Sequence, residues 1–206
     1  MKENVGPSRW PYSVCSRCRG GRPPAWLNCP GPCRSSRSGF RPSILVNSRS
    51  PFPAASGRIA LVHASWHLDI VKQGCDAFIA SMVELGFPAD RIDVLAVPGA
   101  FEIPLHAAKL AARGRYAAIA TCALVVDGGI YRHDFVASAV IDGLMRVQLD
   151  SGVPVFSAVL TPHHFHEHAE HRDYYLRHFQ VKGRELAQAC VATLESLQQL
   201  QALTGS

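Results

Sequence analysis

Four times after Gly57, a short apolar run is followed by a longer segment whose apolar residues have helical spacing. The apolar runs cover residues 58–64, 91–97, 116–126 and 155–160, and the helical segments cover 68–85, 102–113, 133–151 and 181–200. Runs that are apolar throughout, rather than alternating, indicate strands buried on both faces. The alternation therefore predicts an α/β protein in three layers, with a four-stranded parallel sheet covered by helices on both faces.

The first 57 residues have a different composition from the rest of the chain. They hold nine of the 14 prolines and show no regular spacing of apolar residues. Residues 1–58 contain ten Lys and Arg against one acid, Glu3, whereas residues 59–206 contain eleven basic and fifteen acidic residues. We expect 1–57 to be a disordered extension rich in Arg, Pro, Ser and Cys, ahead of one folded domain over 58–206. The basic pI of about 8.9 reflects this extension, so no nucleic-acid partner is expected.

Other roles for the extension stay open. Its C-x2-C-x10-C-x3-C spacing would suit one zinc ion held by four thiolates, those of Cys15, Cys18, Cys29 and Cys33. The Arg- and Ser-rich, acid-poor composition is also typical of an organellar transit peptide, although the prolines disfavour the amphipathic helix that such peptides need. A start codon assigned too far upstream would explain the segment equally well.

Nothing in the chain predicts export or a membrane span. No apolar run reaches the length of about 18 residues that a spanning helix needs, and no apolar segment follows the N-terminal charges. Three cysteines, Cys75, Cys122 and Cys190, lie far apart within predicted helices and strands, as reduced and buried thiols do. We expect a cytoplasmic protein with no membrane partner.

Ligands of open parallel sheets bind beyond the carboxyl ends of the strands. This rule selects four loops, at residues 65–67, 98–102, 127–133 and 161–171. In the first loop, Trp66 either stacks on a planar ring or simply covers the core. In the second, Gly99 and Ala100 would let a ligand approach the backbone closely. Glu102 either accepts hydrogen bonds from sugar hydroxyls or is an acid favoured at a helix start.

The third loop carries groups suited to an anion and to proton transfer. The Gly128-Gly129 pair can form a turn whose backbone amides hold an anion, and the Arg132 guanidinium suits phosphate. His133 can exchange protons near neutral pH. Asp134 either orients the His133 imidazole or caps the helix that follows.

The fourth loop is rich in histidine, with six of the ten histidines between residues 163 and 178. His164, Glu167 and His168 fit the H-x-x-E-H pattern of zinc hydrolases, in which the glutamate acts as general base. A pattern this short is easily matched by chance in a histidine-rich run, and nothing downstream clearly supplies a third ligand. The interpretation we favour is a ligand-facing lid with anion-binding histidines and no metal.

Taken in this order, the four loops resemble those of the lumazine synthases. The most specific motif is V-P-G-A-F-E-I-P at 97–104, and the resemblance covers about 59–201. The stretches D-G-G-I-Y-R-H-D-F-V at 127–136 and L-T-P-H-H-F-H-E at 160–167 are similar to the second-type enzymes of Brucella and rhizobia. The resemblance implies a flavodoxin-like fold and self-association as a pentamer or decamer.

The resemblance also implies a transferase of riboflavin biosynthesis. Such an enzyme condenses 5-amino-6-(D-ribitylamino)uracil with 3,4-dihydroxy-2-butanone 4-phosphate to give 6,7-dimethyl-8-ribityllumazine. An imine forms, phosphate leaves, and the ring closes with loss of water, without a metal or redox cofactor. Carried over from the family, the substrate contacts fall on Trp66, Ala100, Phe101, Glu102, Leu124, Val125, Val126, Gly129 and Ile130.

The third loop departs from the family pattern R-G-x-T-x-H, whose histidine transfers the proton. Arg132 takes the place of that histidine and His133 is next to it, so the catalytic role is expected at His133 or Arg132. Asp127 replaces the arginine of the pattern, and Ile130 replaces the threonine that touches phosphate.

Two further departures concern the end of the chain. The stacking phenylalanine after the fourth strand is Ser157 here, and the phosphate-binding arginine of the last loop falls near His171, with Arg172 beside it. Trp66 opposite the smaller Ser157 would also suit a wider flavin ring. The alternative function is therefore a flavin- or lumazine-binding protein with low turnover, and the remote alternative is the zinc hydrolase.

Overall fold

The computed structural model describes residues 57–127, 132–162 and 169–204, and the backbone alone at 169–171. Four sets of predictions lie outside the described residues: those on the N-terminal extension, on Gly129 and Ile130, on the zinc motif of His164, Glu167 and His168, and on the His171 side chain.

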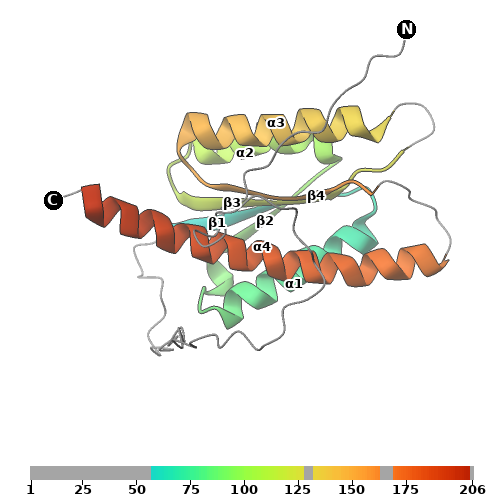
Figure 1. Ribbon diagram of the computed structural model, residues 1–206, viewed down its shortest axis with the longest axis horizontal. Helices are drawn as coiled ribbons and strands as arrows, with labels where there is room; N and C mark the ends of the chain where they lie inside the picture. The colour runs from blue at the N-terminus through green and yellow to red at the C-terminus, as the bar shows by residue number, and fades with distance from the viewer. Residues whose placement is uncertain (1–56, 128–131, 163–168, 205–206) are drawn as a thin grey trace, which may run out of the picture. The chain divides into compact units, whose positions relative to one another are not determined.

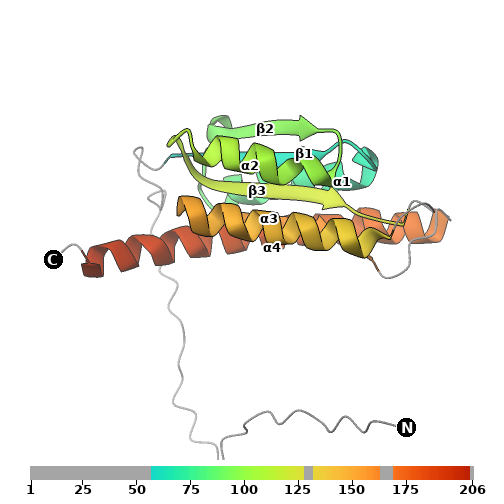
Figure 2. The ribbon, with the colours of Figure 1, turned by 90° about the horizontal axis from the view of Figure 1, so that it is seen from above.

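A single parallel sheet is the centre of the described fold. Its strands are β1 (Arg58–Ala64), β2 (Ile92–Val97), β3 (Tyr116–Leu124) and β4 (Val155–Leu160). Every neighbouring pair is parallel, and the strand order is β2-β1-β3-β4. Figure 2 shows β2, β1 and β3 side by side in this order. The predicted four-stranded parallel sheet is confirmed.

Helices cover both faces of the sheet. They are α1 (Leu68–Glu84), α2 (Ile103–Ala111), α3 (His133–Ser151) and α4 (Ala169–Thr204). In Figure 1, α2 and α3 lie on one face and α1 and α4 on the other. This arrangement, with the order 2-1-3-4, is the flavodoxin-like three-layer fold that the sequence predicts.

The two faces of the sheet bury two separate cores, which explains the uninterrupted apolar runs. On β3, Ala118, Ala120 and Cys122 belong to the core under α1 and α4. The intervening Ile119 and Ala123 belong to the core under α2 and α3. Because side chains alternate across a strand, a strand covered on both faces is apolar at nearly every position, and the buried Thr121 of β3 donates to Phe156 O.

Two glycines allow α1 and α4 to cross at close range. A Cβ atom added at Gly183 of α4 would overlap the carbonyl oxygen of Gly74 on α1. The fully buried Phe179 fills the space beside Gly74, and Gln180 Nε2 donates to Gln73 Oε1 at 2.9 Å. This contact holds α4 against α1 along the same face of the sheet.

The final helix begins earlier than the sequence pattern predicts, at Ala169 rather than at residue 181. No Pro or Gly interrupts residues 169–182, and Tyr175, Leu176 and Phe179 pack on the α1 side of the core. Tertiary contacts therefore extend the helix into a segment whose own apolar spacing is weak. The last residues of the predicted loop 161–171 belong to α4.

Smaller differences concern the second helix and the third strand. The predicted helix at 102–113 begins as a 3-10 turn, η2 (Ala100–Glu102), and α2 ends at Ala111. The third strand ends at Leu124, although the Val125 N–H still donates to Leu160 O at 2.8 Å. Within 57–127, 132–162 and 169–204, no helix is both long and apolar enough to cross a membrane.

Candidate active site

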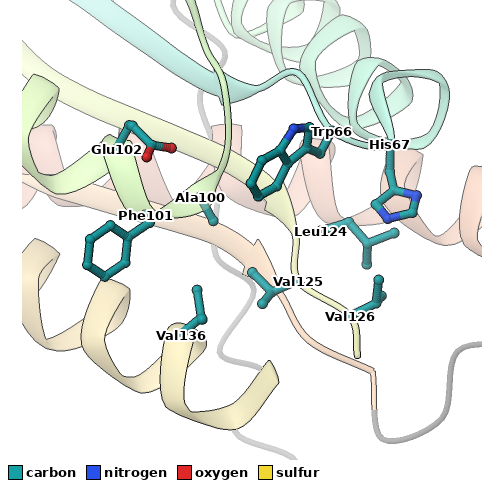
Figure 3. A pocket seen from close by; sticks show the side chains of 9 residues that line it. All are labelled: Trp66, His67, Ala100, Phe101, Glu102, Leu124, Val125, Val126 and Val136. Atoms are coloured by element: carbon teal, nitrogen blue, oxygen red, sulfur yellow. The ribbon is translucent and has the colours of Figure 1, made fainter. Parts of the chain in front are cut away.

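The strand order places a crevice between the carboxyl ends of β1 and β3. In the sheet, β2 lies on one side of β1 and β3 lies on the other, so the direction in which strands are added reverses at β1. Ligands of such sheets bind at this point of reversal. A cavity of about 510 Å³ lies there, and we call it the ring cavity. Its lining is shown in Figure 3 and consists of Trp66, His67, Ala100, Phe101, Glu102, Leu124, Val125, Val126 and Val136. The structure thus brings seven of the predicted substrate contacts together in one cavity.

Trp66 lies over the second loop and forms one wall of the ring cavity. The backbone N–H of Ser65 donates to Val97 O at 2.8 Å and that of Trp66 to Pro98 O at 3.3 Å, which fixes the position of the tryptophan. A Cβ atom at Gly99 would be 2.7 Å from the indole ring, so glycine is required there to make room for Trp66. Trp66 is 61% exposed, which leaves part of its indole open for stacking on a planar ligand.

Glu102 combines a structural contact with a position on the ring cavity. Its Oε2 accepts a hydrogen bond from the Gly99 N–H at 3.0 Å, which satisfies a free donor at the start of η2. The interpretation of Glu102 as a helix-start acid is therefore confirmed. Because a carboxylate has a second oxygen, it can also accept from a ligand hydroxyl, and Figure 3 shows the carboxylate pointing toward the Trp66 side of the cavity.

A second cavity, of about 490 Å³, adjoins the ring cavity, and we call it the polar cavity. Its described lining consists of Asp127, Arg132, His133, Asp134 and Thr161. The two cavities share their supporting elements, because Asp127 directly follows Val126 and His133 precedes Val136 by one turn of α3. Trp66, Glu102 and His133 all follow the carboxyl ends of strands and so lie at the same end of the sheet.

Asp127 orients the His133 imidazole. Its Oδ1 lies 2.8 Å from His133 Nδ1 and accepts the His133 backbone N–H at 2.9 Å. These bonds, the backbone one foremost, lower the pKa of Asp127 below its ordinary value. Since an ionised carboxylate only accepts, the proton of the imidazole resides on Nδ1, and Nε2 is the nitrogen left to take or return a proton.

Asp134 takes neither of its two expected roles, because it does not contact the imidazole and the N-cap of α3 is Arg132. Its carboxylate instead accepts from Arg132, with Nε 3.2 Å from Oδ1, and the guanidinium also lies 5.0 Å from the centre of the Phe135 ring. Among the described residues of the polar cavity, two carboxylates face one guanidinium. Arg132 alone therefore does not make this cavity positive.

The comparisons with known proteins agree with this geometry. A family model for 6,7-dimethyl-8-ribityllumazine synthase matches residues 56–198. The chain belongs to the lumazine synthase family. It is 65% identical over 143 residues to a 6,7-dimethyl-8-ribityllumazine synthase of Rhodococcus erythropolis, which covers 69% of this chain and 92% of the relative. Two relatives named 6,7-dimethyl-8-ribityllumazine synthase 2 are each 53% identical. One is from Pseudomonas syringae pv. tomato (71% of this chain, 86% of the relative) and one from Bradyrhizobium diazoefficiens (69% and 86%).

Within this lumazine synthase chain, one predicted contact lies away from the ring cavity. Ser157 is exposed on β4 and lines a separate cavity of about 410 Å³ with Lys182 and Glu185 of α4. Arg172, the neighbour of His171, forms an ion pair with Asp69 at the start of α1. The described chain therefore does not bring Ser157 to the ring cavity, and it pairs Arg172 with the start of α1.

Two residues of the ring cavity, His67 and Val136, are missing from the sequence-based site. Val136 could have been found, because it lies three positions after His133 on a predicted helix and so shares its face. His67 could not have been found by spacing. Its backbone has φ 53° and ψ 39°, and a single sequence carries no mark of a left-handed residue that is not glycine.

The described residues contain no group of three or more His, Cys, Asp or Glu side chains placed to hold a metal ion. The cysteines Cys75, Cys122 and Cys190 are free and buried, as predicted. Burial raises the pKa of Cys190 to about 12, which makes its thiol a poor ligand and a poor nucleophile.

Proposed function

We propose that this chain condenses 5-amino-6-(D-ribitylamino)uracil with 3,4-dihydroxy-2-butanone 4-phosphate to form 6,7-dimethyl-8-ribityllumazine in riboflavin biosynthesis. The observation that carries the proposal is the ring cavity, which combines an exposed indole, an aliphatic wall and a carboxylate at the edge of the sheet where such folds bind ligands. Membership of the lumazine synthase family supports the same reaction.

The ring cavity suits the pyrimidine substrate. The flat heterocycle would stack on Trp66, which offers a large and rigid apolar face. The chain at Leu124, Val125 and Val126 forms the opposite wall, where backbone groups can meet the pyrimidine edge. Glu102, together with Ala100 and Phe101, would hold the ribityl chain through its second carboxylate oxygen.

The polar cavity suits the proton transfers of the condensation. The amine attacks the ketone carbonyl and water leaves as the imine forms, phosphate is then eliminated, and the ring closes with loss of a second water, so protons move at several steps. His133 Nε2 is available to carry them, because Asp127 fixes the other nitrogen. Arg132 is the residue before His133, and its guanidinium now bonds to Asp134. If it left Asp134, it would balance the charge of a bound phosphate.

Self-association as a pentamer or decamer belongs to the same proposal. On α3, Ile141, Met145 and Leu149 form an apolar stripe at helical spacing, and they are 40%, 51% and 73% exposed. The opposite side of α3 is buried on the sheet, so the stripe is free to meet a second copy. An assembly could also bring a neighbour's Ser157 and last loop to Trp66. We place the protein in the cytoplasm, where its free thiols stay reduced.

A turnover assay tests the proposal. The full chain is given both substrates in the presence of a metal chelator, and product is followed by its absorbance. We expect 6,7-dimethyl-8-ribityllumazine to form at a rate that the chelator does not change. Tight flavin binding without product would instead support the binding-protein alternative, and activity lost to the chelator would support a metal site.

A further inference from the structure

Thr161 directly follows β4 at the carboxyl end of the sheet. The residues on both sides restrict its backbone. The Val125 N–H donates to Leu160 O at 2.8 Å, which ties the end of β4 to the chain that leaves β3. Pro162 follows Thr161, and a residue before proline is held in extended backbone. Thr161 is therefore placed by a rigid strand end.

The alternation of side chains along β4 directs Thr161 to the α3 side of the sheet. Val159 belongs to the core under α2 and α3, whereas Ala158 and Leu160 pack in the core under α1 and α4. The next side chain after Leu160 consequently lies on the same face as Val159. Thr161 lines the polar cavity there, opposite residues of the third loop and α3.

The hydroxyl of Thr161 has no hydrogen-bond partner among the described residues. By contrast, the buried Thr121 donates to Phe156 O at 3.0 Å, and Thr204 bonds to carbonyl oxygens of α4. Thr161 is exposed, so its hydroxyl can donate to a ligand without breaking a bond within the described chain.

The polar cavity needs a neutral donor if it is to hold an anion. Its described side chains set two carboxylates, Asp127 and Asp134, against the one guanidinium of Arg132, which already bonds to Asp134. A hydroxyl donates without any change of charge, and hydrogen bonds to a charged acceptor are stronger than neutral ones. Thr161 also borders a cavity of about 440 Å³ beside α4, but the described lining of that cavity includes no lysine or arginine.

We propose that the Thr161 hydroxyl donates a hydrogen bond to the phosphate group of 3,4-dihydroxy-2-butanone 4-phosphate. This inference rests on the proposed function. The contact would hold the phosphate from the β4 side of the polar cavity, opposite His133 of α3. Because threonine is β-branched and has few rotamers, its hydroxyl loses little freedom on binding.

The test compares Thr161→Val and Thr161→Ser with the unchanged full-length chain. Valine keeps the shape of the side chain without its hydroxyl, and serine keeps the hydroxyl. In Thr161→Val we expect the KM for the ketone phosphate and the inhibition constant of inorganic phosphate each to rise about tenfold. The KM for the aminouracil and kcat should stay within about twofold, because the lost bond contributes to binding alone. Thr161→Ser should keep both phosphate constants within about threefold of wild type.

Thr121→Val is the matched control, because it removes a hydroxyl that the fold itself uses. It should lower the thermal unfolding temperature and leave the KM for the ketone phosphate unchanged. Thr161→Val should do the reverse. The inference would be overturned by phosphate constants within twofold of wild type in Thr161→Val, or by a serine variant as impaired as the valine variant. A raised KM with unchanged inhibition by inorganic phosphate would also overturn it, since the hydroxyl would then contact another part of the substrate.

Calorimetry with inorganic phosphate separates this inference from the proposed function. A wild-type chain that forms no lumazine refutes the function by itself. Phosphate binding by wild type that is about tenfold tighter than by Thr161→Val would still support the contact. Equal binding by the two chains, or no binding by wild type, would overturn the contact and leave an active enzyme as proposed.

Discussion

The polar residues at the two ends of the parallel strands have different roles. We call the end where the strands begin the amino edge of the sheet and the end where they finish the carboxyl edge. At the amino edge, Asp93 of β2 accepts from Arg58 Nε at 2.7 Å, from Arg115 at 2.8 Å and from the Tyr116 hydroxyl at 3.0 Å. At the carboxyl edge, Glu102 and Asp127 bond to nearby groups of their own loops and still line a cavity. The charged side chains of the amino edge bond to one another and join neighbouring strands. The carboxylates of the carboxyl edge keep an oxygen beside a cavity, where a ligand can bind.

We therefore expect the stability of the fold to depend on residues at the amino edge and substrate binding and turnover to depend on residues at the carboxyl edge. Substitutions at the carboxyl edge should change binding or turnover with little effect on unfolding, because the side chains concerned hold no strands together. Substitutions at the amino edge should do the reverse. Each of the following changes tests one side of the comparison.

The largest effect is expected at His133. His133→Ala should lower kcat by about 10²–10⁴-fold, the usual contribution of general acid–base catalysis, with the KM for the aminouracil within about threefold. The backbone N–H that bonds Asp127 is retained, so thermal unfolding should be unchanged. Arg132→Ala is the matched control, and a larger loss in that variant would assign the proton transfer to the aligned position instead.

The next effect is expected at Trp66. Trp66→Ala should weaken binding of 5-nitro-6-(D-ribitylamino)uracil, whose nitro group cannot condense, by roughly tenfold to a hundredfold, because stacking on an aromatic ring is typically worth about 1–3 kcal/mol. Trp66→Phe keeps a ring and should lose much less. Equal affinities in calorimetry for all three proteins would show that the heterocycle does not lie on this wall of the ring cavity.

A smaller effect should distinguish Asp127 from Asp134. Asp127→Asn replaces an acceptor by a group that can also donate, so the imidazole loses its fixed tautomer and kcat should fall by roughly threefold to tenfold. The effect is limited because Asp127 is exposed, and exposed ionic contacts are weak. Asp134→Asn, at the residue directly after His133 and in the same cavity, should leave kcat unchanged. Equal losses in the two variants would contradict the assignment of Asp127.

The smallest effect on turnover is expected at the amino edge. The Arg58 guanidinium, with Arg115 and Tyr116, holds the pKa of Asp93 well below its usual range. A carboxyl whose pKa is lower in the folded chain stabilises the fold above the unfolded pKa of about 4 and loses that contribution as the pH falls further.

Asp93→Asn should therefore lower the urea midpoint at pH 7 and reduce its fall between pH 5 and pH 3, with kcat and KM unchanged. The comparison of the two edges would be wrong if Asp93→Asn altered turnover at pH 7 while its unfolding matched that of wild type.

The sequence was sufficient for the sheet and for most of the ring cavity. Apolar runs such as 116–126 are required by burial on both faces, and the carboxyl-end rule then brings Trp66 and Glu102 together. The sequence pattern did not predict that α4 begins at Ala169. Its first turns are polar and are held by contacts of Phe179 and neighbouring residues with α1 and the sheet, which depend on tertiary structure.

The hydrogen-bond partner or neighbour of each side chain in the site could not be predicted from the sequence either. Asp134 is next to His133 in sequence, yet Asp127, six residues before His133, is the carboxylate that reaches the imidazole, and Asp134 bonds to Arg132. Gly99 was expected to admit a ligand, and the ring that approaches its backbone belongs to Trp66. Spacing predicts which residues share an edge, but the partner of each side chain depends on loop conformation.

The most direct test of the account is a crystal structure of the chain with 5-nitro-6-(D-ribitylamino)uracil bound. We predict that the pyrimidinedione lies on the indole of Trp66, with its ribityl chain at Glu102. A heterocycle bound at the amino edge, or elsewhere with the ring cavity empty, would contradict it.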